Sequence, residues 1–166
     1  YLPKSRPGEK SFQDVTAYGD LSLEDAVALG YPVNTASAKL EYSSNVLKLS
    51  QASVTSDGSR VDLMGSLNTD TQIVDASFDL KGFELARLQD VFGDYFALSG
   101  VGSVIGNISG ALDNMKGVID AKVDGLAINY EKFDRAEAHF VYDDGMFSSF
   151  SVSAARAGQS LDLSGT

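Results

Sequence analysis

The stretch Val33-Asn34-Thr35-Ala36-Ser37-Ala38-Lys39-Leu40-Glu41-Tyr42 decides the fold. From Ala36 onward, every second side chain is apolar, and Ser, Lys and Glu fill the positions between them. Successive side chains of a β-strand point to opposite faces of a sheet, so this spacing predicts a strand with one apolar and one solvated face. The segments that contain Phe78, Ile119 and Phe140 alternate in the same way.

Turn-forming residues separate these alternating segments. Asp57-Gly58, Asp143-Asp144-Gly145 and Ala157-Gly158 each lie between two of them. Glycine and aspartate tolerate the positive φ angles that tight hairpins need. Strands separated by such turns indicate an antiparallel meander, so we expect an all-β fold.

One segment departs from the period of two. Between Phe83 and Phe96, the residues Leu85, Leu88 and Phe92 recur at the spacing of one helical face. This spacing predicts one short amphipathic helix, which we expect to end at a glycine directly after Phe92. A single helical turn is also expected over residues 24–29.

The sequence repeats itself at a shift of 100 residues. Residues 33–42 lie over 133–142, Gly58 falls on Gly158, and turns match turns without a gap. We interpret residues 33–66 and 133–166 as related units. Repeats of this kind predict a quasi-one-dimensional array in which each unit packs on its neighbours.

The chain divides into a short N-terminal segment and a long β-repeat segment. Residues 1–11 contain two prolines and are expected to form a linker or partial strand. Residues 12–166 are expected to form the β-repeat segment. The chain starts at Tyr1 and ends just after a strand-like Leu161-Asp162-Leu163, so we expect it to be a slice of a longer array.

Composition excludes several classes of function. The formal charge is −10 and the pI is near 4.4, which argues against binding of nucleic acid. No cysteine is present, so disulfides and thiolate metal sites are excluded within this chain. No stretch reaches the roughly 18–20 apolar residues that span a bilayer.

The sequence offers little for catalysis, and we expect no enzyme activity, metal or cofactor. The single histidine, His139, alternates with apolar neighbours and is expected to face solvent. Asp143 and Asp144 read as turn residues, because no calcium-binding loop pattern surrounds them. The glycines between Gly100 and Gly106 are expected to relieve crowding where the sheet curls.

The order of these motifs resembles the AsmA-like/TamB superfamily. The resemblance rests on the Phe-x-Leu-x-x-Leu start at Phe83, on Leu98-Ser99-Gly100 and on Ile108-Ser109-Gly110. It also rests on the two Ala-x-Ala-x-(Leu/Phe)-x-Tyr hairpins with their closing Leu-x-Gly strands. It covers nearly all of residues 12–166, although each motif alone is degenerate.

The resemblance implies an elongated sheet curled into an open trough, a "β-taco", with an apolar interior. It implies a periplasmic segment of a cell-envelope protein anchored in the inner membrane. Such proteins are implicated in moving phospholipids between the inner and outer membranes. The TamB branch, part of a translocation and assembly module, is also implicated in outer-membrane protein assembly, which implies an outer-membrane β-barrel partner.

We therefore expect a hydrophobic groove that carries phospholipid acyl chains or other apolar chains. The expected lining residues are Ala36, Ala38, Leu40, Tyr42, Val74, Ala76, Phe78, Leu80, Ile119, Ala121, Val123, Ile128, Phe140, Tyr142, Leu161 and Leu163.

Three alternatives compete with the lipid groove. The segment could be a chaperone-like module for outer-membrane β-barrels or autotransporters that acts by strand augmentation. It could be a structural or adhesive β-repeat that serves as a spacer. The alternating faces could also cover an ordinary sandwich core between two stacked sheets.

Overall fold

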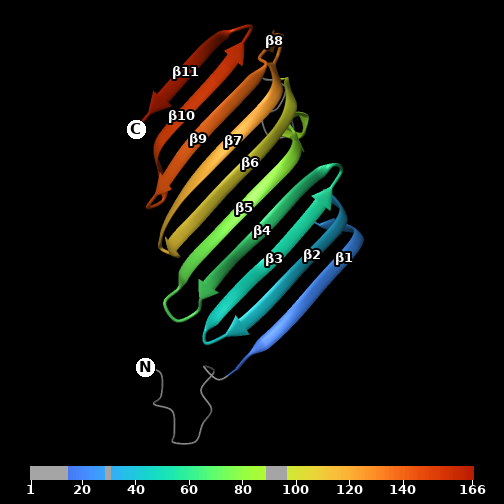
Figure 1. Ribbon diagram of the computed structural model, residues 1–166, viewed down its shortest axis with the longest axis vertical. Helices are drawn as coiled ribbons and strands as arrows, with labels where there is room; N and C mark the ends of the chain where they lie inside the picture. Colours follow the sequence, from blue (N-terminus) through green and yellow to red (C-terminus); the bar gives the residue numbers. More distant parts are fainter. Residues whose placement is uncertain (1–14, 29–30, 89–96) are drawn as a thin grey trace, which may run out of the picture.

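The computed structural model describes residues 15–28, 31–88 and 97–166. Figure 1 shows strands lying side by side in one elongated, curled sheet, with β1 at one end and β11 at the other. The described residues form an eleven-stranded sheet in the order β1-β2-β3-β4-β5-β6-β7-β9-β10-β11, with β8 paired to β7 alone. The two end strands do not pair with each other, so the sheet is open. The predicted all-β, antiparallel architecture is confirmed.

Almost all of the described chain is strand, joined by short turns. The elements are β1 (Ala17–Ala28), β2 (Tyr31–Ser43), β3 (Val46–Ser56), β4 (Ser59–Asn68), β5 (Ile73–Glu84), the 3-10 helix η2 (Leu85–Leu88), β6 (Leu98–Ala111), β7 (Asn114–Ile128), β8 (Glu131–Lys132), β9 (Arg135–Asp143), β10 (Met146–Arg156) and β11 (Gln159–Gly165).

Four hairpins turn through two residues that both have positive φ. This geometry matches the right-handed twist of the strands on either side, and it suits glycine, asparagine and aspartate. The φ angles are 49° and 62° at Ser44 and Asn45, 44° and 82° at Asp57 and Gly58, 48° and 80° at Asp144 and Gly145, and 49° and 80° at Ala157 and Gly158.

The two stretches related in sequence adopt matching structures. β3 and β10 have bounds that differ by 100 residues at both ends, and the hairpins before and after them turn at equivalent positions. β2, β3 and β4 of the first stretch correspond to β9, β10 and β11 of the second. In the sheet the three corresponding strands are neighbours in the same order.

The helical predictions need correction. β1 continues from Glu24 to Ala28, so the predicted turn there is wrong over these residues. Pairing with β2, as between Glu24 and Thr35, satisfies backbone groups that one isolated helical turn would leave open. At Phe83, β5 still pairs with β6, and within residues 83–88 only η2 is helical. Residues 89–96, the rest of the predicted helix, lie outside the described residues, as do residues 1–11.

No second layer seals the sheet in the described parts of the chain. Only Val33 and Leu126 are buried apolar residues there, with 8 % and 9 % of their surface exposed, and no side chain is fully buried. The described residues therefore form a single layer, not a sandwich. They also contain no helix long and apolar enough to cross a membrane.

Candidate functional site

The register of the strands places one unbroken row of apolar residues across the sheet. Directly opposed residues in an antiparallel pair point to the same face. Followed from β1 to β11, one such row is Leu23, Ala36, Val54, Val61, Leu80, Val104, Ala121, Ala138, Val152 and Leu163. We call the side of the sheet to which this row points the apolar face, and the other side the polar face.

A second row runs beside the first on the apolar face. It consists of Leu21, Ala38, Ala52, Leu63, Phe78, Gly106, Ile119, Phe140, Phe150 and Gly165. We call the two rows together the apolar lane. Neither row contains a polar side chain. Ten strands spaced about 4.8 Å apart make the lane roughly 43 Å long.

Eight of the sixteen residues predicted to line a groove belong to the apolar lane. They are Ala36, Ala38, Phe78, Leu80, Ile119, Ala121, Phe140 and Leu163.

The other eight predicted residues lie beside the lane. Leu40, Ala76 and Tyr142 share one flanking row, and Tyr42 and Val74 share the next one out. Val123 and Leu161 share a row on the other flank. Ile128 lies opposite Leu98, beyond a register shift.

Sequence reasoning missed the contributions of β1, β3, β4, β6 and β10. In β3 the alternation breaks at a register shift between Leu49 and Ala52, where pairing with β4 is irregular. In β6 the positions on the apolar face include Gly106, while the apolar Ile105 points to the polar face. If the alternation had been counted separately on either side of a bulge, β3 would have been recognised as a strand with one apolar face.

Glycines on the apolar face make room for large neighbours. A Cβ at Gly106 would lie 2.6 Å from the Phe78 ring, and one at Gly165 would lie 2.5 Å from the Phe150 ring. These distances are far inside van der Waals contact, so the rings lie across the glycines. The predicted role of the glycines near Gly106 in relieving crowding agrees with this packing.

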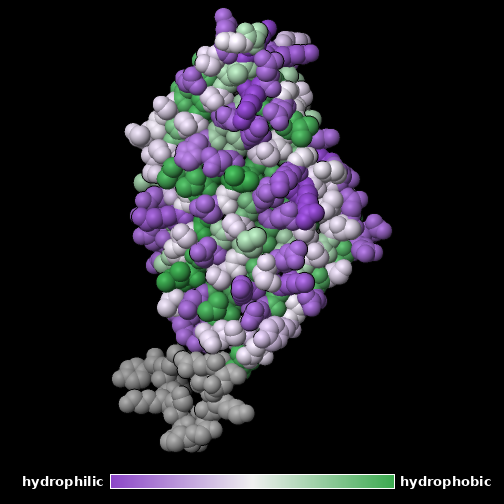
Figure 2. All heavy atoms as spheres, in the orientation of Figure 1, coloured by the Kyte–Doolittle hydropathy of each residue, from purple (hydrophilic) through white to green (hydrophobic). Residues whose placement is uncertain are grey.

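The apolar face remains partly open to solvent. Leu63 is 37 % exposed and Leu163 is 61 % exposed, and Phe78 and Phe140 are only half-buried. A face of this kind presents far more apolar surface than a closed core would leave. The surface seen in Figure 2, by contrast, is dominated by polar residues, with apolar ones scattered among them.

Several charged side chains of the polar face form ion pairs with one another. Arg60 and Asp62 lie 2.8 Å apart, and Lys81 and Asp79 lie 2.6 Å apart. The Arg60 guanidinium donates hydrogen bonds to Asp62, which lowers the pKa of that carboxyl and raises the pKa of Arg60. Charged and paired side chains of this kind suit this face to contact with solvent.

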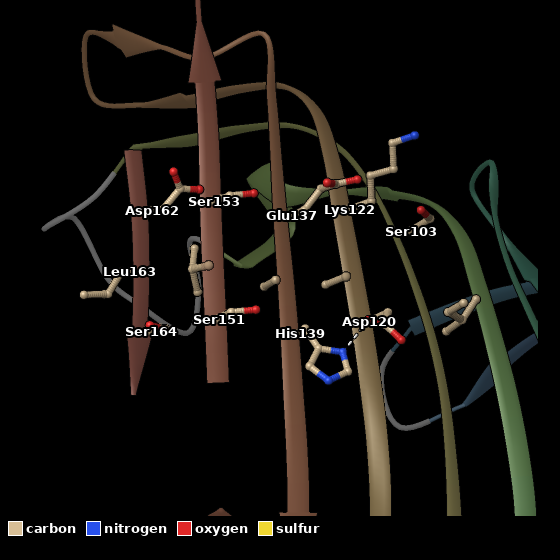
Figure 3. Close-up of a pocket in the computed structure, with 14 residues that line it drawn as sticks. Ser103, Asp120, Lys122, Glu137, His139, Ser151, Ser153, Asp162, Leu163 and Ser164 are labelled. Carbon is tan, nitrogen blue, oxygen red and sulfur yellow. Dashed lines mark hydrogen bonds and ion pairs between the residues drawn. The ribbon is translucent and has the colours of Figure 1, made fainter. Parts of the chain in front are cut away.

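A shallow hollow of about 580 Å³ lies on the polar face over β6 to β11. Figure 3 shows His139 and Asp120 from neighbouring strands joined by a contact of 2.7 Å between Nδ1 and a carboxylate oxygen. Ser151 lies opposite His139 in the register, but no hydrogen bond joins the two among the described residues. In the same parts of the chain, no group of three or more carboxylates and histidines is placed to hold a metal ion.

Comparison of the chain with protein-family models, curated proteins and solved structures gives no match. The resemblance to the AsmA-like/TamB superfamily therefore stays a prediction.

Proposed function

We propose that the apolar lane binds the acyl chains of phospholipids and lets them slide along the sheet. In this proposal the chain is a non-enzymatic segment of an envelope protein that carries phospholipid between the inner and outer membranes. The observation that supports it is the pair of unbroken apolar rows, which cross ten strands under no covering layer among the described residues.

The energetics favour long apolar chains over small ligands. Each buried methylene contributes about 0.8 kcal/mol, so a 16-carbon tail could gain on the order of 10 kcal/mol before ordering costs. A tail needs only a continuous apolar surface, and the lane provides one without a polar interruption. Because neighbouring positions in the lane are chemically alike, moving a tail by one strand changes its free energy little, as sliding requires.

Site-specific photocrosslinking tests the proposal. A photoreactive amino acid placed at Phe78 or at Phe140 should capture phospholipid, detected by mass spectrometry, both in cells and with vesicles of phosphatidylethanolamine and phosphatidylglycerol. The same group at His139 is the matched control, because His139 neighbours Phe140 on β9 but points to the polar face. Protein adducts alone at Phe78 and Phe140, or equal lipid capture at His139, would argue against the proposal.

A charge placed in the lane gives a second test. Ala138 belongs to the first row and lies two residues before Phe140 on β9, so Ala138→Lys should interrupt the apolar surface and reduce lipid capture at Phe140. Ser151→Lys adds the same charge on the polar face of the neighbouring strand and should leave capture unchanged. Circular dichroism of both variants would establish that the sheet is intact.

A further inference from the structure

We propose that the phosphate group of a bound phospholipid lies at one end of the strands, where Arg87 and Arg156 hold it, and that its acyl chains run from there along the apolar face. The inference rests on the proposed function and deepens it, because it names the side chains that recognise the headgroup. The two arginines follow or end β5 and β10, each of which pairs with a neighbouring strand on either side.

The two ends of the strands differ in their charged side chains. The first rim of the sheet carries the turns β2–β3, β4–β5, β6–β7 and β9–β10, and the second rim carries η2 and the turns β3–β4, β7–β9 and β10–β11. Three turns of the first rim contain Asp70, Asp113 and Asp144. Guanidinium groups match the geometry of a phosphate, whereas carboxylates repel it, so the second rim is the better place for a headgroup. In the described parts of the chain every arginine lies at the second rim, namely Arg60, Arg87, Arg135 and Arg156.

Arg156 lies at the end of a run of apolar side chains on β10. Phe150, Val152 and Ala154 point to the apolar face, and alternation places Arg156 on the same side of the strand. From Arg156 to Phe150 the strand is about 20 Å long, at roughly 3.3 Å per residue. One acyl chain spans half of the hydrocarbon core of a bilayer, or about 15 Å. An acyl chain whose phosphate lies at Arg156 therefore reaches the apolar lane.

Arg87 takes the equivalent place beside the first repeat unit. It belongs to η2, which begins at Leu85, and a Cβ at Gly102 on the apolar face would lie 3.2 Å from Leu85 Cδ1. The Arg87 guanidinium lies 3.3 Å from Asp57 in the turn β3–β4. That turn corresponds to β10–β11, the turn directly after Arg156. Each unit thus has a guanidinium at the equivalent turn, although the two come from different parts of the repeat.

Both guanidinium groups keep donors for a phosphate. Each has five N–H donors. Arg156 donates to Glu131 through Nη1. Arg87 approaches Asp57 through Nη2, and its Nε lies 3.9 Å from Glu84. The side chains of Arg156 and Arg87 are 56 % and 34 % exposed, and exposed ion pairs contribute little to stability. A phosphate can therefore join or replace these carboxylates.

Competition between two lipids with the same acyl chains tests the proposal. The vesicles contain phosphatidylglycerol and diacylglycerol, which lacks the phosphate. A photoreactive amino acid is placed at Phe140, which lies opposite Phe150, or at Phe78 on β5. Mass spectrometry measures the ratio of captured phosphatidylglycerol to captured diacylglycerol. Dividing this ratio by the ratio in the vesicles gives the preference of the chain for the phosphate.

We expect Arg156→Gln to lower this preference at Phe140 by about two- to five-fold, because one exposed charge pair with the phosphate is lost. Arg87→Gln should lower the preference at Phe78 by a similar factor. A phosphatidylethanolamine with a photoreactive headgroup should label the second rim, and one with a photoreactive group at the end of an acyl chain should not.

Two arginines of the second rim that lie on the polar face are the matched controls. Arg135 lies opposite Ala155, the residue before Arg156, and therefore points to the other side of the sheet. Arg60 precedes Asp62 on β4, beside β5, and pairs with it on the polar face. Arg135→Gln and Arg60→Gln remove the same charge and should leave the preference unchanged.

Three results would overturn the proposal. The first is a preference that neither Arg156→Gln nor Arg87→Gln lowers. The second is an equal fall in Arg135→Gln, which would assign the effect to net charge. The third is labelling of the first rim by the photoreactive headgroup. Capture of both lipids with an unchanged ratio leaves the lipid proposal intact, whereas capture of neither lipid contradicts both proposals.

Discussion

Asp134 accepts a hydrogen bond of 2.9 Å from the backbone N–H of Ala157, a residue of the turn between β10 and β11. Asn34 accepts the equivalent bond of 2.8 Å from Asp57, in the turn between β3 and β4. Both acceptors precede their donors by 23 residues, and the two bonds are related by the 100-residue shift of the repeat. One bond joins the β3–β4 turn to Asn34 near the start of β2, and the other joins the β10–β11 turn to Asp134, one residue before β9.

These bonds make a prediction about stability. Asp134→Ala should lower the free energy of unfolding by about 1 kcal/mol, because the Ala157 amide loses its acceptor. Asp134→Asn keeps a side-chain oxygen, as Asn34 does in the first unit, and should stay close to the parent chain. Urea denaturation measures both variants. Equal losses for Asn and Ala would show that the oxygen is not the stabilising group.

The turn glycines should resist substitution. Gly158→Ala places a Cβ at a φ of 80°, which should cost on the order of 1 kcal/mol. Gly19 has open space around its Cβ position and no positive φ, so Gly19→Ala should be neutral or slightly stabilising. Thermal unfolding compares the two variants. A loss at Gly19 as large as at Gly158 would contradict the turn argument.

Phe78 and Gly106 should depend on each other. Gly106→Ala drives a methyl group into the Phe78 ring and should cost roughly 1–3 kcal/mol of stability. Phe78→Leu removes the ring atoms that clash, so the double variant should lose less than the two single variants combined. Urea denaturation of all four proteins gives the coupling. Additive losses would mean that the ring does not lie across Gly106 in solution.

The Asp62–Arg60 pair predicts a pH dependence. Hydrogen bonding to Arg60 lowers the pKa of Asp62 in the folded chain, whereas an unfolded aspartate titrates near about 3.9. The pair therefore stabilises the fold above that value, and the contribution is lost as the pH falls through the lowered pKa. Titration by NMR should show the midpoint of Asp62 rising in Arg60→Ala. Arg156→Ala, which removes the partner of Glu131, should leave that midpoint unchanged.

Several features of the fold could be predicted from the sequence. The alternation around Ala38, Phe78 and Phe140 predicted strands with one apolar face, and the structure places all three residues in one row. Such predictions succeed because the side-chain period of a strand is a local property of the backbone. The turns at Asp57-Gly58 and Ala157-Gly158 were also predictable, since positive φ favours a few residue types.

Other features depended on contacts between distant residues. The sequence of Glu24 to Ala28 is compatible with a helical turn, and pairing with β2 is what makes it strand. The side of the sheet to which Ile105 points follows from its register opposite Asp79 and Asp120. A hydropathy pattern alone places Ile105 with the other apolar residues.

By itself, the sequence determined that this chain forms strands, where most of them turn, and which side chains of a strand share a face. Only the tertiary structure decided that these faces join, strand after strand, into one lane across an open sheet. The physical reason is that alternation is set within each strand, whereas continuity across strands is set by register, which hydrogen bonding and bulges fix between residues far apart in the chain.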